Sequence, residues 1–184
     1  MSANELQGYG MIADLIAKLH DKRSWCGETH VQKTAYLTQE LLGVPLGFKF
    51  ILYRHGAYSF DLHEAIGAMR AYRFLGIEVP PPPYGPSLVL TPRGEKLRNH
   101  FQKSNGRFAK QTDWVAERLG DKNVVQLEKL STAYYVTREK EMEKKSVDVR
   151  ARRLHELKPH ISTIEAARAL HDIDAMIEEA PSRA

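Results

Sequence analysis

The chain has little cysteine, no long apolar run and no secretory leader, and each shortage excludes a class of protein. Cys26 is the only cysteine among 184 residues, so no disulfide can form within the chain. No stretch approaches the roughly 20 apolar residues that a membrane-spanning helix needs. The first residues, Met1 to Glu5, lack the basic and apolar regions of a signal peptide. These shortages predict a protein of the reducing cytoplasm with no membrane partner.

Motifs that carry chemistry are also missing. The eight histidines are scattered, with no His-Glu-x-x-His or paired-cysteine spacing that would hold a metal. Gly8 to Ala13 matches Gly-x-Gly-x-x-Ala, but a dinucleotide fingerprint needs a preceding strand, and only seven residues come before it. A Cys26 nucleophile with His20 or His30 as its base is the weakest hypothesis, since sequence proximity fixes no geometry. We therefore expect no enzyme, no cofactor and no metal.

The overall charge is mildly basic. Charged residues make up 27% of the chain and hydrophobic residues 42%, which is ordinary for a globular protein with a core. The formal net charge of +4 favours polyanionic partners such as DNA through long-range attraction. Many proteins of this size are equally basic, so the charge alone decides nothing.

The first third of the chain predicts two helices and a strand. Apolar residues recur at helical spacing from about Tyr9 to His20. Thr29 and Gln32 have the spacing of a capping box, so a second helix should begin there and continue to about residue 42. The aromatic and β-branched run from Phe48 to Tyr53 predicts a strand.

The next segment predicts a helix followed by a hairpin. Ser59 is a suitable cap for a helix that ends near residue 76, with a buried stripe formed by Leu62, Ala65, Ile66, Met69 and Tyr72. Residues 77–79 and 88–90 are candidate strands on either side of a proline-rich loop. Thr91 then caps another helix, with Pro92 at its first position. This order of elements is that of an embellished winged helix.

The second half predicts helices alone. One covers about residues 112–119, and Asn123 and Ser162 cap two others. The densely charged segment 138–153 predicts a solvated helix or a mobile connector. The last helix should bury Ala166, Leu170, Ile173 and Ile177, and its short apolar seam leaves a homodimer open. We therefore predict a mainly α (α+β) fold, with a winged-helix-like domain carrying a small β wing at 1–108 and a helical C-terminal region packing on it at 109–184.

Two motifs resemble a known family. The helix from Gln32 to Leu37 and the Tyr-Arg-His-Gly-Ala-Tyr-Ser turn from Tyr53 to Ser59 resemble the YwgA-like group, which is related to the Panacea antitoxins. The resemblance covers about the first 110 residues. It implies an antitoxin, or an adaptor that contacts other proteins, and it implies no catalytic residue.

A row of basic side chains is the best candidate for binding DNA. Spacings of three, four and three residues place these side chains on one face of the helix after the wing. Together with the next basic residue they form what we call the basic stripe: Arg93, Lys96, His100, Lys103 and Arg107. Arg70 and Arg73, near the end of the preceding helix, are further candidate DNA contacts. A solvated face of an amphipathic helix explains the same pattern equally simply.

Other residues suit a protein partner better than DNA. Asp61 and Glu64 would repel phosphates, although they also stabilise the positive end of a helix. The turn residues Arg54, His55 and Tyr58 and the loop residue Tyr84 complete the candidate partner-binding set. The sequence therefore predicts a non-enzymatic regulatory or antitoxin-like module that contacts DNA. The alternative is a protein-interaction adaptor, of the antitoxin or proteolysis type, without DNA binding.

Overall fold

The protein is mainly helical, as the sequence predicts, with two small antiparallel hairpins. The computed structural model describes residues 2–79, 81 and 85–183. Its helices are α1 (Ala3–Asp21), α2 (Glu28–Glu40), α3 (Phe60–Ala71), α4 (Pro92–Asn105), α5 (Ala109–Leu119), α6 (Val124–Thr137), α7 (Val147–Leu157) and α8 (Thr163–Glu179), with a short 3₁₀ turn, η1 (Gly106–Phe108). One hairpin joins β1 (Ile51–Tyr53) to β2 (Gly56–Tyr58), and the other joins β3 (Leu75–Glu78) to β4 (Ser87–Leu90).

The predicted helix caps are confirmed at four helices. The side-chain oxygen of each cap accepts a hydrogen bond from the backbone N–H three residues later, at 3.0–3.3 Å. The caps are Ser59, Thr91, Asn123 and Ser162. Each such cap stabilises its helix by about 1 kcal/mol, so local chemistry fixes where these helices begin.

The capping box predicted at Thr29 is wrong. Helix α2 begins one residue earlier, after Gly27, and has no side-chain cap. Gln32 is instead buried and bonds in both directions to the backbone of Ser59: its amide nitrogen donates to the Ser59 carbonyl, and its oxygen accepts from the Ser59 N–H, both at 2.9 Å. Gln32 therefore fastens α2 to the start of α3.

Three other boundaries differ from the prediction. The strand begins only at Ile51, because the backbone of Phe48 is already bonded by the Gln39 side chain, at 2.8 and 3.0 Å. Helix α3 ends at Ala71, because Arg73 adopts a left-handed φ of 57°, which closes the helix.

 The third boundary is the start of the first helix, which lies at Ala3 because the Ser2 hydroxyl accepts from the Glu5 N–H at 3.2 Å.

Arg23 closes α1 in the same left-handed way, with a φ of 62° and the Ser24 N–H bonded to the Leu19 carbonyl at 3.0 Å. Two residues predicted to be buried are exposed. Tyr72 lies beyond the last turn of α3, and Ile177 lies on the outer side of α8. The seam proposed for a homodimer therefore has only Leu170 and Ile173 in the core.

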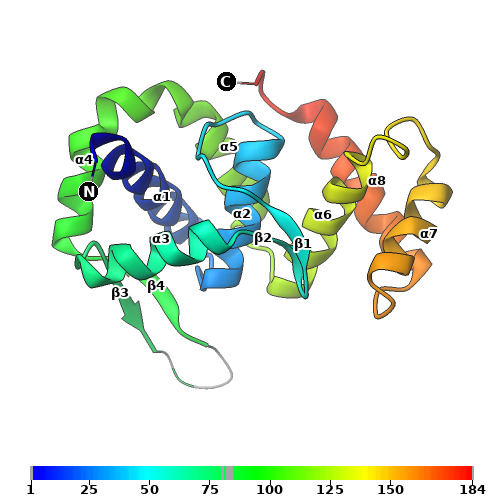
Figure 1. Cartoon of the computed structure of the whole chain (residues 1–184), viewed down its shortest axis with the longest axis horizontal. Helices are drawn as coiled ribbons and strands as arrows, with labels where there is room; N and C mark the ends of the chain where they lie inside the picture. The colour runs from blue at the N-terminus through cyan, green and yellow to red at the C-terminus, as the bar shows by residue number, and fades with distance from the viewer. Residues whose placement is uncertain (1, 80, 82–84, 184) are drawn as a thin grey trace.

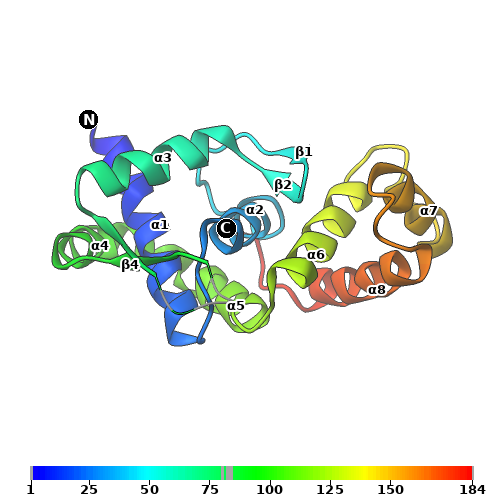
Figure 2. The ribbon, with the colours of Figure 1, turned by 90° about the horizontal axis from the view of Figure 1, so that it is seen from below.

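A continuous apolar core joins the helices. Helix α1 packs against α4 and α5, and α2 packs against α5, α6 and β2. Helices α6, α7 and α8 gather at the end of the molecule opposite α4 (Figure 1, Figure 2). The predicted boundary between 1–108 and 109–184 falls where η1 meets α5, and the two-part division stays a prediction.

The charged segment 138–153 is tied to its neighbours. Arg150 is buried and donates to both carboxylate oxygens of Asp174, at 2.8 and 2.6 Å, and to the Thr137 hydroxyl at 3.0 Å. Arg153 donates to Glu139 at 2.9 Å. A two-pronged contact of this kind fixes the guanidinium plane as well as its position. Arg150 therefore holds α7 against α8, while most of the charged side chains of the segment are exposed, as expected of a solvated segment.

Candidate functional site

Helix α4 carries the first four residues of the basic stripe on its outer face, and Arg107 follows in η1. Arg93, Lys96, His100, Lys103 and Arg107 are all exposed. The opposite face is held by close contacts at two glycines. A Cβ atom on Gly94 would stand 2.1 Å from the Phe74 carbonyl oxygen, and one on Gly10 of α1 would stand 3.0 Å from the Phe101 ring. Because glycine permits both approaches, α4 is clamped between the wing base and α1, and its basic face must point outward.

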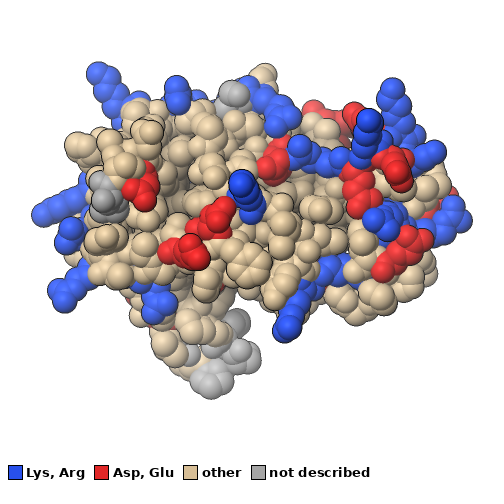
Figure 3. Space-filling view, viewed as in Figure 1, with Lys and Arg blue, Asp and Glu red and all other residues tan. Residues whose placement is uncertain are grey.

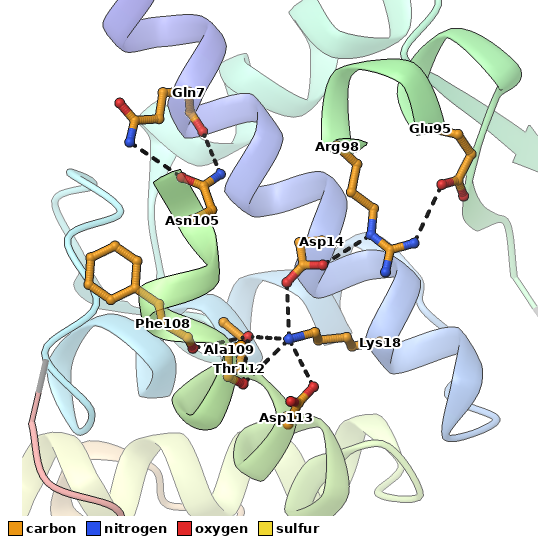
Figure 4. Close-up of polar contacts among 10 residues, drawn as sticks. All are labelled: Gln7, Asp14, Lys18, Glu95, Arg98, Asn105, Phe108, Ala109, Thr112 and Asp113. Atoms are coloured by element: carbon orange, nitrogen blue, oxygen red, sulfur yellow. Dashed lines mark hydrogen bonds and ion pairs between the residues drawn. The ribbon is translucent and has the colours of Figure 1, made fainter. Parts of the chain in front are cut away.

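Polar contacts between α1 and α4–α5 fix the same orientation (Figure 4). Asp14 accepts from Arg98 at 3.0 Å and from Lys18 at 3.2 Å. Lys18 also donates to the Thr112 hydroxyl at 2.7 Å and pairs with Asp113 at 2.8 Å. These charges pair with one another on the inner side of α4, so they leave the positive charges of the basic stripe uncompensated.

The basic stripe itself is unpaired. Across residues 2–79, 81 and 85–183, none of its members forms an ion pair. Lys and Arg side chains project from the left edge of the molecule, where α4 lies (Figure 3). Lys110, at the start of α5, is exposed as well and follows the stripe in sequence. Helical spacing did not predict Lys110 as part of this surface, because a new helix begins at Ala109.

Arg73 lies with the stripe, and Arg70 does not. The Thr91 hydroxyl, at the start of α4, donates to the Arg73 carbonyl at 2.5 Å. The Arg93 guanidinium lies 5.2 Å from the centre of the neighbouring Phe74 ring. Arg73 and Arg93 therefore both lie at the base of the β3–β4 hairpin. Arg70 lines a separate groove beneath the wing.

The turn predicted to contact a partner carries an exposed aromatic cluster. The ring centres of Tyr53, Tyr58 and Phe60 lie 5.1–5.6 Å apart. Phe60 is 52% exposed and Tyr53 41%. The Arg54 guanidinium lies 5.9 Å from the centre of the Tyr53 ring. Sequence reasoning found Arg54 and Tyr58 but missed Tyr53 and Phe60.

The other predicted partner-binding residues are dispersed around this cluster. His55 is exposed at the hairpin tip, 3.8 Å from Glu128, and Asp61 and Glu64 are exposed on the first turns of α3. Tyr84 lies outside the described residues. Burial, and next the neighbouring Glu28 carboxylate, raise the pKa of the Tyr58 hydroxyl. The structure therefore places the aromatic cluster between a basic tip and an acidic helix start.

Two buried lysines support the hairpin from below. Lys33, only 2% exposed, donates to the Ala57 carbonyl at 2.9 Å, and burial lowers its pKa to about 8. Lys158 donates to the Arg54 carbonyl at 2.6 Å and also to that of Tyr53. Sequence reasoning missed both lysines. Their signal was weak, since a lysine among apolar residues usually extends its amine to solvent.

The hypothesis of a Cys26 nucleophile finds no support in the local contacts. Burial raises the pKa of the Cys26 thiol to about 12, so the reactive thiolate is scarce at neutral pH. His20 is engaged elsewhere, with its Nε2 2.7 Å from the Leu88 carbonyl oxygen. His30 bonds the backbone of Lys122. Cys26 therefore behaves as a small core residue.

No family model matches the chain, and no curated protein matches it significantly. The YwgA-like resemblance therefore stays an expectation from the sequence. Among the described residues, no helix is long and apolar enough to cross a bilayer. Within the same part of the chain, no three His, Cys, Asp or Glu side chains gather as a metal site requires.

Proposed function

We propose that the protein is a non-enzymatic regulatory or antitoxin-like module that contacts duplex DNA through the basic stripe. The observation that supports this most directly is the orientation of α4. Its inner face is clamped by Gly94 and Gly10, so its basic side chains face outward without carboxylate partners among the described residues. Unpaired cations along one ridge are what a phosphate backbone attracts.

The dimensions of the stripe agree with this proposal. Arg93 and Lys103 are ten residues apart in α4, which is about 15 Å along a helix. That length corresponds to roughly four base steps of 3.4 Å. Arg73, at the wing base, adds a further cation at one end. The stripe can therefore follow one strand of a duplex over several phosphates.

The acidic side chains of α3 do not oppose the stripe. Asp61 and Glu64 lie on the first turns of α3, next to β2, whereas its last turn lies next to the wing and α4 (Figure 1). The length of α3 therefore separates these carboxylates from a duplex bound along α4.

Contacts to phosphates without base-reading side chains favour binding with little sequence preference.

A charge-reversal experiment tests the proposal. The double variant Lys96→Glu/Lys103→Glu should abolish binding of a fluorescein-labelled duplex, measured by fluorescence anisotropy. The control is Lys144→Glu/Lys145→Glu, which changes the net charge by the same amount at exposed sites between α6 and α7. The control should bind like the wild type. Equal affinities for both double variants would show that α4 is not the contact surface.

The salt dependence gives a second readout of the same contact. If the four arginines and lysines of the stripe each neutralise one phosphate, the logarithm of the binding constant should fall with the logarithm of salt concentration with a slope of about −3.6. A slope near zero would contradict the proposal.

The exposed aromatic cluster favours a second candidate, a protein-interaction adaptor. Tyr53, Phe60 and Arg54 are of the residue types that contribute most to protein interfaces. Binding through such a cluster is largely apolar and should change little with salt. A protein partner that is retained at high salt and lost on Phe60→Ser would support the adaptor, while the stripe variant would retain it.

A further inference from the structure

A groove of about 1030 Å³ lies beneath the wing, apart from the basic stripe and from the aromatic cluster. Four segments form its walls: the connection from α1 to the start of α2, the second half of α3, the wing strands with the residues just before β4, and the turn between α5 and α6. We call it the wing groove. Its volume is just above the range for small-molecule sites, about 300–1,000 Å³.

The walls of the wing groove are largely apolar. Ile66 contributes from α3, Ile77 and Leu88 from the wing, and Val124 from the start of α6. Trp25, which is half-buried, supplies an indole ring. A groove with an indole and several branched aliphatic side chains suits a flat apolar body.

The charges in the groove are unbalanced. Arg23 and Arg70 both line it, and neither forms an ion pair within the described part of the chain. The two acidic residues of the lining are engaged: Glu28 lies 2.7 Å from His63 Nδ1, and Asp121 lies 3.3 Å from Lys122 Nζ. The lining, which also includes Lys122, has three cations against two carboxylates, and two guanidinium groups without a carboxylate partner among the described residues favour an anionic group on the ligand.

The start of α2 adds donors to the same wall. Helix α2 has 13 residues, and its cap, Gly27, offers no side chain to the first backbone N–H groups. His30, in the first turn, is 5% exposed and lines the groove, and its Nδ1 has no hydrogen-bond partner among the described residues. A buried polar atom without a partner is costly unless something binds it. The uncapped start of α2 and the unpartnered Nδ1 atom of His30 belong to the same groove lining as the two arginines.

We propose that the wing groove binds a small organic anion in which a phosphate or carboxylate group is joined to a flat apolar body. Arg23, Arg70 and the start of α2 hold the anionic group. Trp25, Ile77 and Val124 cover the apolar body. The site is separate from the DNA contact, so its test uses no DNA.

The test compares a charged and an uncharged dye. Anilinonaphthalene sulfonate carries an anionic group on a flat aromatic body, and N-phenyl-1-naphthylamine is its uncharged counterpart. The wild type should bind the sulfonate more tightly. Arg70→Gln should weaken the sulfonate about tenfold, the loss of one charge-assisted contact, and leave the uncharged dye unchanged. Arg23→Gln should act in the same way, and Arg152→Gln, at an exposed site on α7, should change neither affinity.

Displacement then distinguishes the two sources of the anionic group. Adenosine monophosphate presents a phosphate on a flat body, and indole-3-acetate presents a carboxylate. Displacement of the bound sulfonate by either one, weakened by Arg70→Gln, supports the proposal and names the group. Equal sulfonate binding by the wild type and both arginine variants, or no displacement by either anion, would overturn it.

Discussion

Lys33 should make the stability of the protein rise at alkaline pH. Its amine is buried against the Ala57 carbonyl, and burial lowers its pKa from 10.5 to about 8, with Glu128 opposing and Lys158 reinforcing the effect. Between pH 8 and 10.5 the folded protein therefore holds fewer protons at this site than the unfolded chain. Raising the pH through this window stabilises the fold, by about 3 kcal/mol when complete, because each pKa unit corresponds to about 1.4 kcal/mol.

The substitution Lys33→Met isolates this contribution. Methionine fills a similar volume but cannot donate to the Ala57 carbonyl, and the unpaired acceptor costs about 1–3 kcal/mol at every pH. Between pH 7.5 and 10.5, we expect the free energy of unfolding of the wild type to rise by about 3 kcal/mol relative to that of the variant. The assay is urea unfolding followed by circular dichroism at several pH values across this range.

Lys49→Met removes an exposed amine from the segment before β1, and its unfolding free energy should follow the wild type across the range. A constant difference between the wild type and Lys33→Met from pH 7.5 to 10.5 would refute the reasoning. It would mean that the Lys33 amine is as well solvated by its partners in the fold as by water.

Two further predictions concern the packing of small residues. Gly56 has a φ of 85°, so Gly56→Ala strains the backbone. The added Cβ would also stand 2.7 Å from the Ser131 hydroxyl, and this clash should destabilise the fold by about 1–3 kcal/mol beyond the backbone strain. Gly47→Ala is the matched control, since Gly47 has a φ of 83° but open space around it, and equal losses in urea unfolding would exclude the clash. Cys26 should resist an aromatic disulfide reagent at pH 8 in the native protein and react fully in urea, and rapid native labelling would contradict its burial.

The caps and the β3–β4 hairpin could be predicted because their causes are local. Ser59, Thr91, Asn123 and Ser162 each act on an amide three residues away, so the sequence contains the whole interaction. The hairpin of β3 and β4 follows likewise from two short apolar runs joined by a proline-rich loop. The spacing within α4 also predicted one shared basic face.

The buried polar contacts could not be predicted because their partners are distant. Gln32 bonds a residue 27 positions away, Lys33 one 24 positions away, and Arg150 one 24 positions away. Helical periodicity describes only which side a residue faces, and it placed none of these side chains against its partner. The wing groove was missed for the same reason, since its lining comes from four segments of the chain.

The contact between Lys158 and the β1–β2 hairpin has a consequence for synthesis of the chain. Lys158 donates to the carbonyl of Arg54, a residue 104 positions earlier. At a ribosomal rate of about 5–20 residues per second, Lys158 is added about 5–20 s after Arg54. During that interval the hairpin can be anchored by Lys33 but lacks its second anchor, so its aromatic cluster is held less firmly until the C-terminal part of the chain has been made.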